Sequence, residues 1–162
     1  MAKNRAPGIA RPFSAMDWET LPREIWAQAR EEARAREFQG DYRIFASDID
    51  PRAIEIAQKN AARAGVEDCI QFAVSDACAF WRETERGSIV TNPPYGERLL
   101  ERTEAEALYR DFGAAMKNAR NWQLLLLSSH PEFERCFGRP ADKKRKLYNG
   151  MIRCELYHYL EK

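Results

Sequence analysis

The sequence lacks closely spaced glycines, and this absence bears directly on ligand binding. Only eight of the 162 residues are glycine, only Gly8 and Gly40 precede Asp48, and no two glycines are close enough to form G-x-G. Nucleotide-binding α/β units usually carry a glycine-rich loop after the first strand, about 20 residues or more before an acidic turn. No loop of this kind can be recognised in the sequence.

Paired cysteines are also lacking. The four cysteines form no C-x-x-C pair and no zinc-binding pattern with His130 or His158; they are Cys69, Cys78, Cys136 and Cys154. This spacing argues against a disulfide framework and against a metal site. Cys69 and Cys154 lie in strand-like runs and are predicted to be small core residues.

Neither a charge excess nor a long apolar run is present. The chain has 26 basic and 25 acidic residues, a formal net charge of +1, so its overall charge gives no case for nucleic-acid binding. The longest aliphatic run, Leu124 to Leu127, has four residues, and no signal peptide is recognisable. We therefore expect a cytoplasmic protein with no membrane partner.

A strand, an acidic turn and a helix can be predicted near residue 50. Residues 42–47 form a strand-like run that leads into Asp48-Ile49-Asp50-Pro51. The next apolar residues recur at helical spacing; they are Ala53, Ile54, Ala57, Ala61 and Ala64. Asp50 suits the N-cap of this helix and Pro51 its first position. Asp48 is left for another role.

Asp48 stands where open α/β sheets often bind a ribose. An acidic side chain at the end of the second strand typically accepts hydrogen bonds from ribose hydroxyls. The alternative is an ordinary turn residue, and the sequence leaves both interpretations open. A second strand, Cys69 to Val74, ends in the same way at Ser75-Asp76-Ala77.

The most specific pattern is Asn92-Pro93-Pro94-Tyr95, which follows the β-like run Ser88 to Thr91. An Asn side-chain oxygen and the next carbonyl can each accept one hydrogen of a planar amine, which fixes the nitrogen lone pair towards an electrophile. Consecutive prolines restrict the backbone and aim these oxygens, and Tyr95 offers a face for stacking an extruded base. A strand-terminating turn with an exposed Tyr is the alternative.

The other segments complete an alternating pattern. Residues 19–38 predict one amphipathic helix, with Leu21, Ile25, Ala29 and Ala33 recurring every four residues. Thr103 with Glu106 predicts a capping box, followed by a core-facing stripe of Ala105, Leu108, Tyr109, Phe112 and Met116. Residues 79–86 predict a short helix or loop, 122–128 a buried strand, and 131–137 a short helix ended by Gly138.

The last 18 residues predict an antiparallel hairpin. Its turn pair is Asn149-Gly150, and Ile152, Cys154, Leu156 and His158 alternate with polar or aromatic residues. His158 is interpreted as a packed or rim histidine rather than a catalytic one. The basic run Lys143 to Lys146 fits either a contact with RNA phosphates or a solvated loop.

Alternation of strands and helices predicts an α/β fold with a parallel sheet. The length fits one domain over 1–162, a helical segment at 1–40 followed by sheet and helices at 41–162.

These residues resemble a known family, the class I methyltransferases that use S-adenosylmethionine. Among them, the chain is most similar to the bacterial 23S ribosomal RNA guanine amino-methyltransferases, formerly described as adenine-specific DNA methylases. The resemblance runs through residues 46–50, Asn60-Ala61-Ala62, 88–98 and Lys146 to Gly150. It implies a Rossmann-like sheet in the order 3-2-1-4-5-7-6 that ends in an antiparallel hairpin.

The resemblance also implies roles for particular residues. Asp48 would bind the cofactor ribose, Ile49 would lie beside the adenine, and Asp76 with Ala77 would contact the adenine amine. Asn92 to Tyr95 would hold the target amine, with Asn92 also beside the cofactor. The implied partner is RNA, specifically large-subunit ribosomal RNA with a guanine target.

The departure from the family is the missing glycine-rich loop and the first, central strand before it. On this comparison Met1 falls inside or just after the helix that follows that loop, so the chain resembles the carboxyl-terminal part of a longer protein. Loss of the central strand would expose the edges of the second and fourth strands. We expect these edges to pair directly, or to be filled by an N-terminal region or a second chain.

Two other functions stay open. The same tetrapeptide would suit an amino-methyltransferase acting on adenine in DNA or on a protein glutamine. A chain without the glycine loop could also be catalytically inert and bind only RNA or a protein partner.

Overall fold

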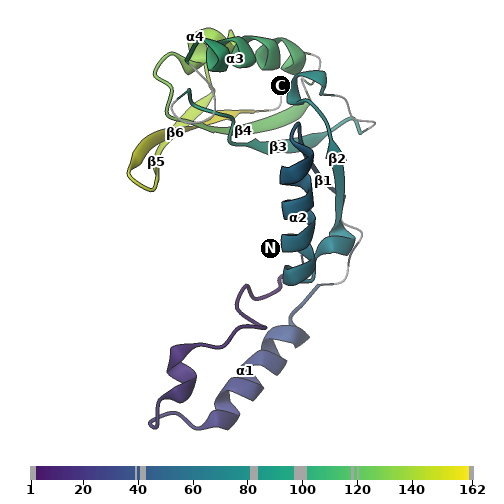
Figure 1. The fold of residues 1–162 in the computed structure, drawn as a ribbon, viewed down its shortest axis with the longest axis vertical. Coiled ribbons are helices and arrows are strands. Elements are labelled where there is room, and N and C mark those ends of the chain that lie inside the picture. The colour runs from purple at the N-terminus through teal and green to yellow at the C-terminus, as the bar shows by residue number, and fades with distance from the viewer. Residues whose placement is uncertain are drawn as a thin grey trace. The chain divides into compact units, whose positions relative to one another are not determined.

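The structure is a computed structural model that describes residues 3–38, 40, 43–80, 84–96, 102–117, 119 and 121–160. The chain divides into two compact units, Met1–Val74 and Ser75–Lys162. The first holds two parallel strands with their connecting helix, and the second holds a larger mixed sheet (Figure 1).

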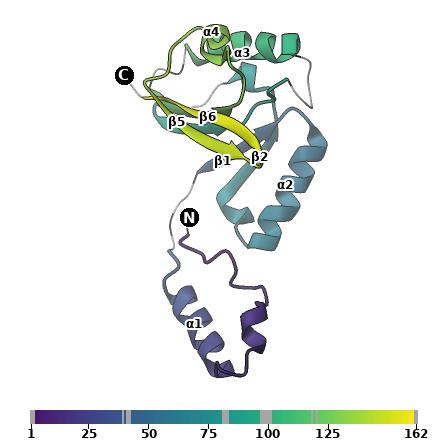
Figure 2. The ribbon, with the colours of Figure 1, turned by 90° about the vertical axis from the view of Figure 1, so that its left-hand side faces the viewer.

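The first unit is a β-α-β element preceded by a separate helix. Its helices are α1 (Arg23–Ala35) and α2 (Pro51–Ala64), and its strands are β1 (Ile44–Asp48) and β2 (Ile70–Val74). β1 and β2 pair in parallel, from Ile44 opposite Ile70 to Asp48 opposite Val74, and α2 packs against both strands (Figures 1 and 2). The predicted N-cap is confirmed, because the Asp50 side chain accepts a hydrogen bond from the Arg52 amide and Pro51 follows as the first helical residue.

The second unit is a four-stranded sheet with two helices on one face (Figures 1 and 2). Its elements are β3 (Gly87–Thr91), α3 (Arg102–Met116), β4 (Trp122–Ser128), α4 (Phe133–Phe137), β5 (Lys143–Asn149) and β6 (Ile152–Tyr159). The order is β3-β4-β6-β5, with β3 and β4 parallel and β6 antiparallel to both of its neighbours.

The core of this unit is aromatic. Phe133 has no exposed surface and packs against Tyr109, Phe137 and Tyr157, with ring centroids 5.0, 5.3 and 4.6 Å away. The predicted stripe on α3 is confirmed, since Ala105, Tyr109 and Phe112 are buried. The two cysteines expected in the core, Cys69 and Cys154, are buried as well.

The strand order confirms the predicted fold class. The sheets read β2-β1 and β3-β4-β6-β5, which correspond to the 3-2 and 4-5-7-6 parts of the expected order. Among the described residues, no strand corresponds to the first strand of that order.

One expectation about this gap is wrong. Direct pairing between the second and fourth strands would join β1 to β3, but these strands belong to separate sheets in the part of the chain that the structure describes. The edge of β1 opposite β2 and the edge of β3 opposite β4 are therefore unpaired among the described strands.

Local details of three helices and the hairpin also differ from the predictions. Helix α1 is shorter than the predicted 19–38, since Pro22 stands at its N-cap. Thr103 lies inside α3, so it does not cap this helix, and Glu106 instead pairs with Arg102 over 3.4 Å. The predicted helix at 131–137 begins at Phe133, and it ends at Gly138 in the left-handed conformation, as predicted.

The hairpin turn is shifted by one residue. Asn149 pairs with Ile152, so the two-residue loop is Gly150-Met151 rather than Asn149-Gly150. Gly150 has φ of 62°, as the first loop residue of a type II′ turn requires. The basic run at 143–146 belongs to strand β5 rather than to a loop, and all four of its residues are exposed to solvent.

Candidate active site

Asp48 and Ile49 lie at the carboxyl end of β1. Asp48 is the last residue of the strand and is exposed, and one of its carboxylate oxygens accepts a hydrogen bond of 2.9 Å from the Asp50 amide. Its other carboxylate oxygen has no hydrogen bond to a described residue. The Ile49 side chain is 69% exposed. Asp48 thus shapes the turn and still presents an oxygen to solvent, so both interpretations of this residue are compatible.

Asp76 and Ala77 open a short 3₁₀ turn that follows β2 in the sequence. The Asp76 side chain caps this turn by accepting a hydrogen bond of 2.8 Å from the Cys78 amide. Both Asp76 and Ala77 are exposed. Asp76 repeats the arrangement of Asp48, with one carboxylate oxygen held by a nearby amide.

Asn92 to Tyr95 leave the carboxyl end of β3, one residue after its last member, Thr91. Asn92 is exposed, and its side-chain oxygen accepts a hydrogen bond from the Tyr95 hydroxyl. The Pro93 carbonyl has no hydrogen-bond donor among the described residues. Of the two oxygens predicted to hold an amine, the Pro93 carbonyl thus has no donor among the described residues, and the Asn92 oxygen accepts a hydrogen bond from the Tyr95 hydroxyl.

Tyr109 of α3 fixes the tetrapeptide through a hydrogen bond to Pro94. Its hydroxyl donates a hydrogen bond of 2.6 Å to the Pro94 carbonyl and lies 3.3 Å from the Ser128 hydroxyl. Tyr109 and Ser128 are fully buried, and burial raises the pKa of the Tyr109 phenol, which therefore stays a donor at neutral pH. The position of the second proline is thus fixed by a partly buried hydrogen bond across 15 residues.

His130 and Glu106 extend this support. The Ser128 hydroxyl accepts a hydrogen bond of 3.1 Å from the His130 amide, and the His130 ring packs edge-on against Tyr109. The His130 side chain is 2% exposed, and its Nε2 lies 3.5 Å from a Glu106 carboxylate oxygen without forming a hydrogen bond. Burial lowers the pKa of His130, which favours the neutral imidazole.

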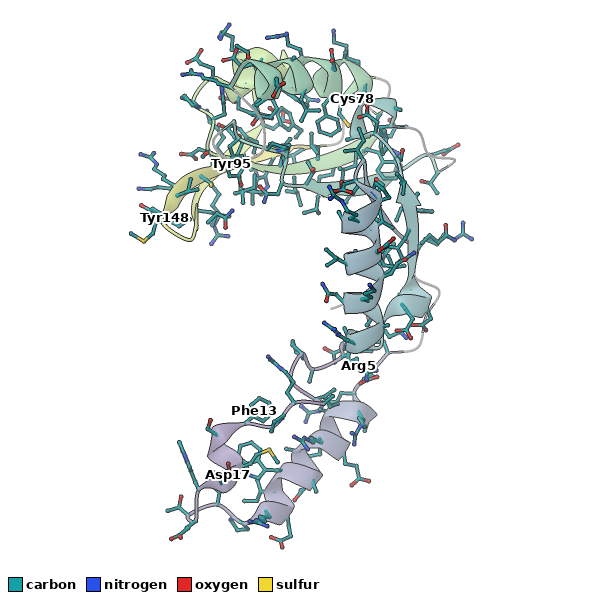
Figure 3. All side chains as sticks on the ribbon, in the orientation of Figure 1. Arg5, Phe13, Asp17, Cys78, Tyr95 and Tyr148 are labelled. Atoms are coloured by element: carbon teal, nitrogen blue, oxygen red, sulfur yellow. The ribbon has the colours of Figure 1, made fainter. Side chains whose placement is uncertain are left out.

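The β5–β6 hairpin reaches the tetrapeptide from another side. Burial raises the pKa of the Tyr95 phenol, and the nearby Asn149 side chain opposes this shift. Cys154 of β6 also interacts with the Tyr95 hydroxyl. Figure 3 labels Tyr95 together with Tyr148, the residue before Asn149 on the hairpin.

The other described side chains show no arrangement for nucleophilic or metal chemistry. Burial raises the pKa of the Cys78 thiol to about 11, so it stays protonated at neutral pH. The four cysteines are free, and within the described ranges no three His, Cys, Asp or Glu side chains gather to hold a metal ion. No described helix has the length and apolar character needed to cross a membrane.

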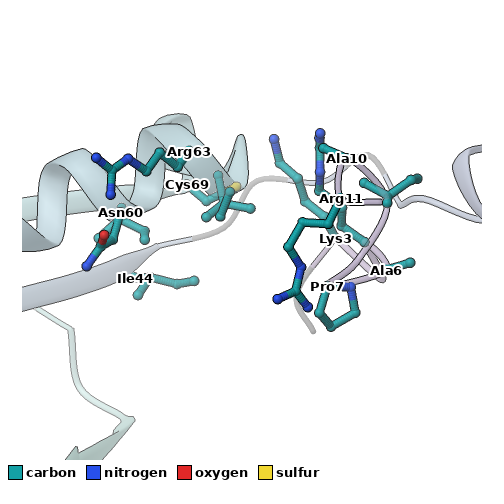
Figure 4. Close-up of a pocket in the computed structure, with 14 residues that line it drawn as sticks. Lys3, Ala6, Pro7, Ala10, Arg11, Ile44, Asn60, Arg63 and Cys69 are labelled. Carbon is teal, nitrogen blue, oxygen red and sulfur yellow. The ribbon is translucent and has the colours of Figure 1, made fainter. Parts of the chain in front are cut away.

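A cavity of about 780 Å³ in the first unit lies away from the predicted residues (Figure 4). It is lined by Ile44 and Ile70, the first residues of β1 and β2, and by Asn60 and Arg63 of α2. Asp48 is at the opposite end of β1. The cavity is therefore not the predicted cofactor site.

The structure thus brings together part of the predicted site. Tyr109 holds the tetrapeptide through Pro94, Ser128 lies beside the Tyr109 hydroxyl, and Asn149 lies near Tyr95; the sequence analysis missed the role of these three residues. Asp48 and Ile49 belong to the first unit, whereas Asp76 and Ala77 belong to the second. The sequence did contain one indication of the role of Tyr109. A tyrosine within an apolar helical stripe becomes buried, and its hydroxyl then needs a hydrogen-bond partner.

We expect the Tyr109→Phe substitution to destabilise the second unit by about 1–2 kcal/mol, because the Pro94 carbonyl and the Ser128 hydroxyl both lose a buried partner. Urea denaturation would measure the change. Tyr157→Phe is the matched control, since Tyr157 is equally embedded in the core but its hydroxyl has no hydrogen bond to a described residue. Equal losses in the two variants would contradict a special role for the bond to Pro94.

The strand order and the residues at the strand ends define a class I methyltransferase fold. The family model described as "UPF0020: RMKL-like, methyltransferase domain" matches residues 1–158, and the chain belongs to this family.

Three relatives illustrate the similarity. The "Putative RNA methyltransferase YpsC" of Bacillus subtilis (strain 168) is 42% identical over 163 residues, which cover 100% of this chain and 42% of YpsC. The "Ribosomal RNA large subunit methyltransferase K/L" of Shewanella baltica (strain OS185) is 36% identical and is matched over 98% of this chain and 23% of its own length. A solved structure, "SMU.472, a putative methyltransferase complexed with SAH", has a TM-score of 0.94 and 35% identity, covering 99% of this chain and 43% of that one.

The chain therefore spans about two fifths of the length of YpsC and of SMU.472, and about a quarter of the K/L enzyme.

Proposed function

We propose that this chain carries out methyl transfer from S-adenosylmethionine to the exocyclic amine of a base in RNA, with guanine in large-subunit ribosomal RNA as the target. The observation that carries the proposal is the position of Asn92 to Tyr95 at the end of β3, fixed by the partly buried hydrogen bond from Tyr109 to Pro94. The names of YpsC and of the K/L enzyme support RNA as the substrate class. A ribosomal target would place the reaction in the cytoplasm.

Methyl transfer requires alignment of the amine with the methyl donor rather than a strong base. The sulfonium methyl group of the donor is already electrophilic, so the protein has to orient the amine lone pair towards it. The Asn92 side-chain oxygen and the Pro93 carbonyl would each accept one amine hydrogen. For this the Tyr95 hydroxyl must leave Asn92, which frees the Tyr95 ring to stack on the base.

We assign the cofactor contacts to strand-end residues within a single catalytic domain proposed over 1–162. Asp48 would bind the ribose through its outward carboxylate oxygen, and the exposed Ile49 side chain would lie against the adenine. Asp76 and Ala77 would meet the adenine amine, and Asn92 would border the methyl group. The complex of SMU.472 with SAH supports a cofactor of this type.

The open strand edges complete the proposal. We assign the free edges of β1 and β3 to a strand supplied by the N-terminal region of a longer polypeptide or by a second chain. Backbone amides on an unpaired edge exchange with deuterium unless another strand covers them. Light scattering on the chain, with amide exchange of β1 and β3, would distinguish the sources: protection with a dimeric mass supports a second chain, and unprotected edges on a monomer support the longer polypeptide.

The test of the function is product analysis. The chain, alone and extended by its upstream coding sequence, is incubated with methyl-labelled S-adenosylmethionine and either ribosomal RNA, DNA or protein. Methylguanosine among the nucleosides supports the proposal, whereas methyladenine in DNA or methylglutamine in protein would replace it. Calorimetric titration with S-adenosylhomocysteine addresses the inert alternative, because micromolar binding would eliminate a wholly inert chain.

A further inference from the structure

The β5–β6 hairpin carries unneutralised positive charge along an outer strand of the sheet. All four basic residues from Lys143 to Lys146 are exposed. Lys144 is paired with Glu134 over 2.7 Å, but Lys143, Arg145 and Lys146 have no carboxylate partner among the described residues. Glu155, the register partner of Lys146, is instead paired with Arg153 over 3.3 Å. Three cations on one strand therefore remain available to a polyanion.

The three cations are reachable from both faces of the strand. Lys143 and Arg145 point to one face of β5, and Lys146 points to the other, because side chains alternate along a strand. β5 is the end strand of its sheet and pairs only with β6 among the described strands. A phosphate backbone that follows the free edge of β5 can thus reach all three side chains.

The tip of the hairpin adds exposed apolar surface to this charge. Tyr148 is 64% exposed and Met151 is 98% exposed. The Lys146 ammonium lies 5.4 Å from the centroid of the Tyr148 ring, which places a cation beside one aromatic face. An aromatic ring flanked by cations is the combination that single-stranded nucleic-acid sites use to stack bases and bind phosphates.

Protection of the sheet edge explains only part of this arrangement. Lysines on an outer strand do hinder pairing with other chains. An exposed Tyr and an almost fully exposed Met at the tip have no such effect, since they add apolar surface exactly where protection would remove it. A ligand with both negative charge and planar apolar groups accounts for the cations and the tip together.

The hairpin also adjoins the candidate active site. The pKa of the Tyr95 phenol responds to the side chains of Asn149, the residue after Tyr148, and of Cys154 in β6, so both lie near the Tyr95 hydroxyl. Tyr148 directly precedes Asn149 at the tip of the same hairpin, with its side chain on the opposite face of β5. A nucleotide strand that enters this site must pass close to the hairpin.

We propose that the β5–β6 hairpin binds the single-stranded RNA next to the target nucleotide, with phosphates along Lys143, Arg145 and Lys146 and a base stacked on Tyr148. This inference rests on the proposed function for its choice of RNA. It goes further by naming the element that recognises the substrate, and by extending recognition beyond the base that reacts.

The experiment measures RNA binding alone, without cofactor or turnover. Fluorescence anisotropy follows the 162-residue chain titrated into a labelled single-stranded oligoadenylate of about 10 nucleotides, within the usual site sizes of such proteins. One variant combines Lys143→Gln, Arg145→Gln and Lys146→Gln. The control combines Arg34→Gln, Arg110→Gln and Lys117→Gln, which removes the same charge from two exposed helical positions and from the exposed residue that follows α3.

We expect the hairpin variant to weaken binding about tenfold or more at low salt and the control to weaken it about twofold or less. The slope of log affinity against log salt should fall by about 2 in the hairpin variant, since each phosphate contact on a single strand contributes about 0.7. Tyr148→Ala should weaken binding about fivefold or more, and Tyr148→Phe should restore it, because stacking needs only the ring. Circular dichroism checks that all variants keep their fold.

Several outcomes would overturn the proposal. These are an absence of RNA binding, equal effects of the hairpin and control variants, equal affinities of Tyr148→Ala and Tyr148→Phe, or binding of an acidic peptide as tightly as RNA. Failure of the proposed function looks different: no methylated RNA would be found, while oligoadenylate binding would still depend on the hairpin.

Discussion

Replacing Asn92 by Ala should lower turnover about 100-fold or more while leaving the affinity for S-adenosylhomocysteine within a few-fold of its original value. The side-chain oxygen of Asn92 is one of two groups proposed to hold the amine, and precise placement of a reacting group is commonly worth this much. Loss of that oxygen frees the amine to rotate and its lone pair to delocalise. Removal of a contact to the cofactor alone would instead weaken binding.

The measurement combines initial rates at saturating cofactor with calorimetric titration. Asn121→Ala is the matched control, because Asn121 is an exposed asparagine of the same unit that precedes β4. Asn92→Asp keeps an acceptor oxygen and should fall between the wild type and Asn92→Ala. Equal losses of turnover and cofactor affinity in Asn92→Ala would contradict the assigned role.

The Tyr95 hydroxyl gives a further reason to expect that Asn92→Ala lowers the rate more than the binding. It occupies the Asn92 oxygen in the structure, so the incoming amine exchanges one hydrogen bond for another rather than filling a vacant site. Such an exchange costs little net free energy. The advantage of Asn92 therefore lies in orientation, which affects the rate more than the binding of either substrate.

The fold was predictable from sequence where local pattern and burial agree. Trp122 to Ser128 was predicted as a buried strand, and β4 has these bounds, because the apolar run Leu124 to Leu127 forms its centre. The turn at Asp48 to Pro51 was predictable for a similar reason, since a capping Asp and a Pro act within a few residues.

The errors arose where two local signals compete. Thr103 with Glu106 matches a capping box, but Arg102 with Glu106 matches a helical ion pair, and in the structure Arg102 is already helical. Asn149-Gly150 is a common turn pair, but Gly150 followed by Met151 fits a two-residue loop equally well. The register of β5 against β6 decides this choice, and it depends on contacts along the whole hairpin.

The support of the site was not predictable, because it is made of distant contacts. Tyr109 belongs to an apolar stripe and was assigned only to the core, yet its hydroxyl fixes Pro94. Ser128 was taken as the end of a buried strand, yet it meets the same hydroxyl. Sequence motifs identify the chemical groups at strand ends. The residues that support these groups depend on tertiary packing, which a local motif does not show.

Gly113→Ala tests this link between packing and the site, and we expect it to destabilise the second unit by about 2–3 kcal/mol. Intrinsic helix propensity predicts the opposite sign, since Ala is favoured over Gly inside a helix by about 1 kcal/mol. Gly113 is buried in α3, however, and a β-carbon there would overlap the backbone carbonyl oxygen of Phe137 in α4. Overpacking of this kind typically costs about 1–3 kcal/mol, and backbone cannot rotate away as a side chain can.

We expect Gly113→Ala to lower turnover as well as stability. Tyr109 lies one turn before Gly113 on α3, so separation of α3 from α4 would draw the Tyr109 hydroxyl away from the Pro94 carbonyl. Urea denaturation measures the stability, and turnover at low urea measures the site. Ala114→Gly is the control, because this exposed neighbour should lose only about 1 kcal/mol through propensity and leave turnover unchanged. A Gly113→Ala variant more stable than the wild type would show that α3 and α4 do not pack this closely, and the account of how Pro94 is held would fail with it.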